Sequence, residues 1–149
     1  MRGAAQKAEA RAVAYRGAIG ALQAAEQHRD ALNEALRWLR GEAVHAERRL
    51  RPPVAADLHA RLTSQVTTLA EALAGEGHKA DRHRREIARL RAAGQHRDAL
   101  NEALRWLSSD AAARARRDPG EAPGMYRQLT DRITGLAAAV PGYRPERRH

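Results

Sequence analysis

The feature that most constrains this chain is a stretch of thirteen residues that occurs twice. QHRDALNEALRWL runs from Gln27 to Leu39 and again, without a change, 68 residues further on. The same spacing joins six identical pairs upstream. Downstream, after a one-residue deletion in a segment rich in Pro and Gly, a spacing of 67 joins seven more between Leu62 and Gly75 of the first copy. These matches predict a tandem duplication, with one unit at 1–75 and a second at 76–149 that ends in a basic tail.

Each unit is predicted to be all-helical, because Ala, Leu, Arg, Glu and Gln dominate it and the chain has no Phe and few β-branched residues. A long helical segment, a polar loop and a shorter helix are expected in each, with the loops at 41–53 and 108–124. Apolar residues recur at steps of three and four in both shorter helices: Leu58, Leu62, Val66, Leu69 and Leu73, then Met125, Leu129, Ile133, Leu136 and Val140.

One hairpin cannot hide two apolar stripes, so the two units are expected to share one core. A bundle of about four helices, formed by two helical hairpins, is the simplest architecture that buries all of them.

The long segments carry one local conflict. Their apolar stripe passes through Arg29 and Arg97, and burying an unpaired charge is costly. Either these side chains reach water or the helices break near 26–29 and 94–97, and the sequence leaves both open. If they break, Gly94 suits a helix C-terminus, and Asp30 and Asp98 suit the N-caps that follow.

The segment GQHRDALNEALRWL, with Gly94, Ala99 and the following ALRWL, resembles the second half of a tetratricopeptide repeat, and 68 is twice that family's period of 34. The resemblance implies stacked helical hairpins. It covers about fourteen residues per copy. The first-half pattern fits poorly, and the half-period positions near Arg61 do not match, so a bundle remains the preferred interpretation.

Copy one has an unusual face opposite its core stripe. Small residues occupy Ala10, Ala14, Gly17 and Ala21, whereas copy two has arginines at the places equivalent to the last three, at positions 82, 85 and 89. A helix that is small or apolar nearly all round is usually buried or in contact with a partner. This face is therefore a candidate for docking a second subunit or a partner helix; the alternative is alanine drift on a solvated surface.

The repeated segment offers a second candidate surface, with His28 and Trp38 in copy one and His96 and Trp106 in copy two. Trp is enriched at the energetic centres of interfaces, although a Trp at helical spacing is more commonly core. The identity of all thirteen residues exceeds what packing requires. Either the two coding segments have been kept alike, or both copies present one surface to one kind of partner.

The formal net charge of +9 suggests nucleic acid as an alternative partner. The candidate phosphate contacts are Arg48, Arg49, Arg82, Arg85, Arg89, Arg116 and Arg117. Acidic residues are interleaved with the basic ones, no recognised nucleic-acid-binding motif occurs, and no aromatic cluster offers a stacking platform.

Catalysis is not expected, and no metal, cofactor or small-molecule substrate is predicted. The chain has no Cys, no phosphate-binding Gly-rich loop and no nucleophile–base grouping. A di-metal bundle needs two Glu-x-x-His motifs, and outside the basic tail only Glu42 and His45 have that spacing. No apolar run is long enough to span a membrane, and no secretory signal is recognised. The sequence thus predicts a non-catalytic, cytoplasmic interaction or assembly module that contacts another protein or itself.

Overall fold

The computed structural model describes residues 2–74 and 78–144, which form helices and connecting turns without any strand. In chain order the helices are α1 (Arg2–Ala24), α2 (His28–Arg49), α3 (Pro52–Leu73), α4 (His78–Ala92), α5 (His96–Arg117) and α6 (Ala122–Ala139), followed by a 3-10 turn, η1 (Val140–Gly142). The all-helical class is confirmed, but the expected count of about four is wrong. Six α-helices form because each long segment ends and restarts.

The break between α1 and α2 is a Schellman turn. The Gln27 N–H donates to the Leu22 carbonyl oxygen at 2.8 Å and the Glu26 N–H to that of Gln23 at 3.0 Å, which satisfies two carbonyl groups at the end of α1. The turn between α4 and α5 has the same pattern. Its left-handed position holds Gly94, at φ 75°, whereas the first turn has Glu26 there, at φ 60°. The break that the sequence left open is therefore present in both halves.

Two local expectations are corrected. Asp30 and Asp98 are not the N-caps. Gln27 and Gln95 hold those positions without a side-chain cap bond, and the aspartates lie in the first turns, where a negative charge favours the helix dipole. The predicted loops are also mostly helix. Pro52 opens α3 rather than stopping the helix before it, because a proline in the first turn lacks only an N–H that would have no intrahelical partner.

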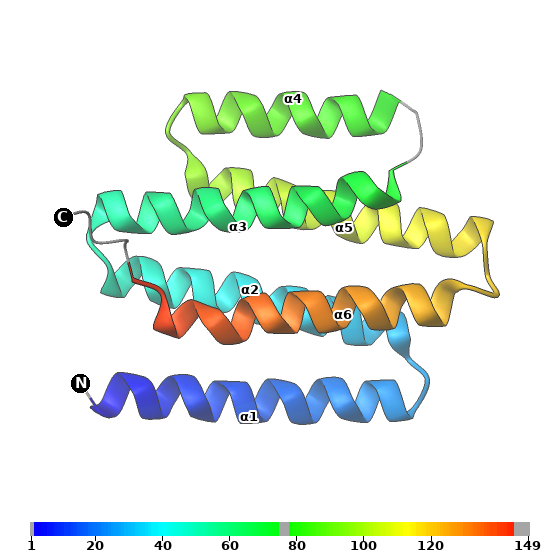
Figure 1. Ribbon diagram of the computed structural model, residues 1–149, viewed down its shortest axis with the longest axis horizontal. Coiled ribbons are helices and arrows are strands. Elements are labelled where there is room, and N and C mark those ends of the chain that lie inside the picture. The colour runs from blue at the N-terminus through cyan, green and yellow to red at the C-terminus, as the bar shows by residue number, and fades with distance from the viewer. Residues whose placement is uncertain (1, 75–77, 145–149) are drawn as a thin grey trace.

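The four central helices, α2, α3, α5 and α6, do not pack in chain order. α3 lies mainly against α5, and α6 mainly against α2, so each half, 2–74 and 78–144, covers the other. α1 packs on α2 and α4 on α5, which places these two helices at opposite sides of the central four (Figure 1). This crossed arrangement differs from a tetratricopeptide array, where successive hairpins stack on their neighbours.

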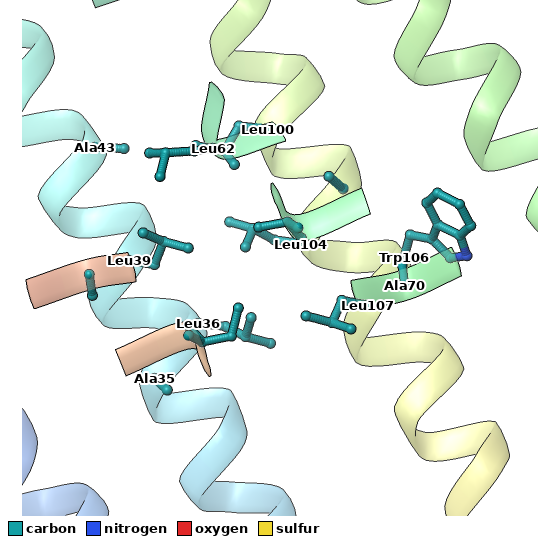
Figure 2. Close-up of a cluster of buried hydrophobic side chains, with 14 of the residues drawn as sticks. Ala35, Leu36, Leu39, Ala43, Leu62, Ala70, Leu100, Leu104, Trp106 and Leu107 are labelled. Atoms are coloured by element: carbon teal, nitrogen blue, oxygen red, sulfur yellow. The ribbon is translucent and has the colours of Figure 1, made fainter. Parts of the chain in front are cut away.

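The core lies where α2, α3, α5 and α6 meet. Leucines of α2 and α5 point toward one another across it, and Leu62 of α3 belongs to the same buried cluster as Leu100 (Figure 2). Leu62 and Leu129 are 4% and 6% exposed, as the apolar stripes predict. The stripes also contain buried Thr63 and Thr130, whose hydroxyl groups donate to the carbonyl oxygens four residues earlier at 2.7 Å. None of the described helices is both long and apolar enough to cross a membrane.

Candidate interaction surfaces

The outer face of α1 carries the four small residues singled out in the sequence. Ala10, Ala14, Gly17 and Ala21 are all exposed, on the side of α1 that faces away from α2. Val13 lies among them and is 66% exposed, the one large hydrophobic side chain that is exposed in the described ranges. A Cβ atom added at Gly17 would have no neighbour within 4 Å. We call residues 10, 13, 14, 17 and 21 the α1 stripe.

The equivalent face of α4 has a different chemistry. Arg82, Arg85 and Arg89 are exposed there, at the places that correspond to Ala14, Gly17 and Ala21. Arg89 forms an ion pair with Glu86 at 2.5 Å, and this hydrogen-bonded partner lowers the pKa of the Glu86 carboxyl group. The two outer helices therefore share a position in the fold but present an uncharged face and a charged face to solvent.

Trp38 and Trp106 lie in the core, where they attach the outer helices. The Trp38 ring, 1% exposed, stacks on Tyr15 of α1 with centroids 5.7 Å apart and planes at 11°. Trp106, fully buried, stacks on His83 of α4 at 5.6 Å and 13°. Burial keeps both indole rings off the outer surface, so a protein partner docking there would not touch them, and the core interpretation accounts for both.

His28 and His96 begin α2 and α5 and are half-buried, each with a buried Nδ1 atom that has no partner among the described residues. The first turns of α2 and α5 lie at opposite ends of the bundle (Figure 1). The structure therefore does not join the two histidines into one surface, and neither is part of the α1 stripe.

A buried ion pair joins α1 to α2. The Arg11 guanidinium donates to both carboxylate oxygens of Glu42, from Nε at 2.6 Å and from Nη2 at 3.0 Å. Glu42 is 2% exposed, and this hydrogen bonding raises the pKa of Arg11 above its ordinary value. Sequence reasoning missed this pair. Arg11 and Glu42 are 31 positions apart, and whether they meet depends on the register between α1 and α2.

The second half uses its corresponding acid differently. Asp110, equivalent to Glu42, accepts a hydrogen bond from Trp106 Nε1 at 2.8 Å, and Lys79 stands where the first half has Arg11. In the first half the Trp38 Nε1 atom is buried without a partner. Two indole rings in matching positions therefore differ in whether their N–H group is satisfied.

The second half has its own polar link between the outer and central helices. His83 Nδ1 lies 2.8 Å from an oxygen of Glu102, and Arg105 donates to the other oxygen at 2.8 Å. Burial of the Glu102 carboxyl group raises its pKa, but the hydrogen bonds from Arg105 and His83 outweigh burial and hold the pKa below its ordinary value.

The arginines proposed for nucleic-acid contact are not gathered on one face. Arg48 and Arg49 end α2, while Arg116 and Arg117 end α5. Those helix ends lie at opposite ends of the molecule (Figure 1). The remaining three, at positions 82, 85 and 89, lie on α4. A single stretch of duplex or single strand would have to wrap around the bundle to reach all seven.

Carboxylate and imidazole groups do not cluster as metal ligands among residues 2–74 and 78–144. Glu42 and His45, which have the spacing of half a di-metal motif, diverge, because Arg11 engages both oxygens of Glu42 while His45 is exposed. No family model, curated protein or solved structure matches the chain.

Proposed function

We propose that this protein is a non-catalytic assembly module that self-associates through the α1 stripe, with α1 of one copy packed against α1 of a second. The observation that carries the proposal is the uncharged outer face of α1, where Val13 is 66% exposed among small residues. On a chain with a net charge of +9, a face without charge is where two identical molecules approach with the least repulsion.

The chemistry of the α1 stripe suits a helix–helix contact. Ala10, Ala14, Gly17 and Ala21 recur at steps of four, three and four, so they form one ridge without long side chains. Two such helices can bring their backbones close together, and Val13 supplies apolar area that leaves water. A single pair of helices buries less than the roughly 1,200–2,000 Å² of a standard stable interface. The association is therefore expected to be reversible and to depend on concentration.

The likeness between the two halves supports an origin by tandem duplication, which we include in the proposal. α2 and α5 have the same length and begin 68 positions apart, and both tryptophans stack on the outer helix with nearly the same geometry. After duplication, the outer face of α4 would have acquired charge while that of α1 stayed neutral. This gives the molecule one associating face rather than two.

Sedimentation at increasing concentration tests the proposal. The weight-average mass should rise above 16.4 kDa. The triple variant Ala14→Arg, Gly17→Arg and Ala21→Arg should stay at the monomer mass. Arginines occupy the equivalent places on α4, so these substitutions are compatible with the fold.

Ala88→Arg, on the exposed surface of α4, is the matched control and should associate as the unmodified protein does. A mass that stays at the monomer value, or a triple variant that associates like the unmodified protein, would show that the stripe is not the interface. Little salt dependence is expected. Co-purifying nucleic acid and a steep salt response would instead favour the alternative based on the arginines.

A further inference from the structure

One cleft in the molecule lies between the amino-terminal half of α1, the carboxyl-terminal half of α2, and the end of α6 with η1. Its volume is about 670 Å³, within the usual range for sites that hold small ligands. Alanines from all three helices form much of its wall, among them Ala8, Ala46 and Ala137. Among the described residues, α4 begins at His78, the position equivalent to Ala10, so the two turns that α1 adds before that position have no described counterpart in α4.

The charged side chains of the cleft are mainly basic. Lys7, Arg11, Arg49 and Arg144 line it, against two carboxylates, Glu9 and Glu42. Arg11 and Glu42 neutralise one another through their two hydrogen bonds. Three cations and one carboxylate therefore remain to set the local potential, which favours an anion.

A buried donor without an acceptor also borders this cleft. Trp38 lines it, is 1% exposed, and has no hydrogen-bond partner for Nε1 among the described residues. The indole N–H can only donate, and a buried donor without an acceptor costs free energy on the order of 1–3 kcal/mol. Glu42, one turn further along α2, accepts from Arg11 at both of its oxygens and does not accept from Trp38.

The second half of the chain indicates which group would satisfy this donor. Trp106 has the same stacking geometry as Trp38, and each has an arginine over its ring, at 5.7 Å and 5.6 Å. The Trp106 N–H points along its helix to a carboxylate oxygen of Asp110, 2.8 Å away. Trp38 lines the cleft and lacks such a partner, so a carboxylate from outside could supply the acceptor that Asp110 supplies in the second half.

We propose that this cleft binds a small organic carboxylate with an apolar body, whose carboxylate accepts from Trp38 Nε1 and lies among Lys7, Arg49 and Arg144. The apolar body would lie against the alanine walls. This departs from the expectation of no small-molecule ligand that the sequence alone gives. The site is separate from the α1 stripe, which lies on the outer face of the same helix, so the two proposals succeed or fail independently.

The chain has two tryptophans, so the indole N–H groups give two signals in a proton–nitrogen NMR spectrum, which Trp38→Phe assigns. Octanoate is the probe, with 1-octanol and inorganic phosphate as matched ligands that lack the charge or the apolar body. Octanoate should shift the Trp38 signal saturably and leave the Trp106 signal in place. Octanol should bind at least about tenfold more weakly because it lacks the charge that strengthens the hydrogen bond, and phosphate at least about tenfold more weakly because it lacks the apolar body.

Arg11→Lys combined with Glu42→Asp reproduces the residues of the second half and should satisfy Trp38 internally. This variant should bind octanoate at least about tenfold more weakly, and an unchanged Trp106 signal shows that it is folded. Arg49→Gln should also weaken binding, whereas the triple arginine variant of the α1 stripe should bind normally. The proposal is overturned if octanoate leaves the Trp38 signal unmoved at millimolar concentration, if both indole signals shift together, if phosphate or octanol binds equally well, or if the double variant retains full affinity.

Discussion

Glu26 occupies, at φ 60°, the left-handed turn position that Gly94 occupies at φ 75° in the second half. The two turns make the same pair of backbone hydrogen bonds. The packing of the helices, and not the type of residue at this position, therefore determines the left-handed backbone conformation. An L-residue with a Cβ atom is strained in this region, while glycine is not.

Glu26→Gly should therefore stabilise the protein by about 0.5–1 kcal/mol, because relief of strain exceeds the added entropy of the unfolded chain. Gly94→Ala should destabilise it by about 1 kcal/mol, although a Cβ atom there meets no neighbour within 4 Å. Urea denaturation of both variants measures these changes. The two changes in unfolding free energy should have opposite signs, and a destabilising Glu26→Gly would contradict the argument.

The buried ion pair predicts an asymmetric response. Arg11→Met should cost about 3 kcal/mol, because it leaves Glu42 buried without a partner. Glu42→Leu should cost less, because Arg11 is 26% exposed and its guanidinium can reach water. The double variant should recover much of the loss from Arg11→Met. A complete double-mutant cycle in denaturant measures this, and a loss below about 1 kcal/mol for Arg11→Met would contradict it.

The Glu102 carboxyl group predicts a specific dependence on pH. Its pKa in the folded state lies below the ordinary value of 4.5, so its charged form stabilises the fold above that pH. This contribution should fade as the pH drops through 4.5 toward the lowered folded-state pKa. The difference in unfolding free energy between the unmodified protein and Glu102→Gln should therefore shrink on acidification. His83→Tyr, which keeps a ring over Trp106 but removes the imidazole donor, should reduce that pH dependence, and an unchanged dependence would contradict the role given to His83.

The crossed packing of the halves predicts coupling between residues far apart in the chain. Leu62 of α3 and Leu100 of α5 are both buried in the core, where α3 packs on α5 (Figure 2). Leu62→Ala and Leu100→Ala should each cost about 2–5 kcal/mol. Their double variant should depart from additivity by about 0.5 kcal/mol or more. As the control, Leu62→Ala is combined with Leu22→Ala on the outer helix α1, and the losses of unfolding free energy from these two substitutions should add.

Much of this architecture could be predicted from the sequence, because it rests on local periodicity. The steps between Leu58, Leu62 and Val66 identify a buried helix face wherever that helix packs. The conflict at Arg29 left two outcomes open, a break or an exposed side chain, and the structure has both: the helix ends and restarts before Arg29, and Arg29 is exposed. The loop expected at 41–53 is mostly helix, because Pro52 lies in the first turn of α3, a position that suits proline.

The candidate sites were less accessible to sequence reasoning. The neutral face of α1 could be found, because Ala14 and Gly17 differ from their counterparts in the second half. Arg11 and Glu42 could not be paired, since nothing along the chain fixes which side chains of α1 meet which side chains of α2. Whether the Trp38 N–H finds an acceptor depends likewise on how the helices pack, so its lack of a partner could not be predicted either.

The placement of α3 on α5 and of α6 on α2 has a consequence for how the chain reaches its native state. During synthesis, the first three helices emerge with the apolar side of α3 exposed, and its cover, α5, is still inside the ribosome. Contacts that span so much sequence slow folding, because a long loop must close before they contribute. Until α5 emerges, the apolar face of α3 is therefore exposed to solvent and prone to aggregation. A chaperone that shields this face would act in that interval.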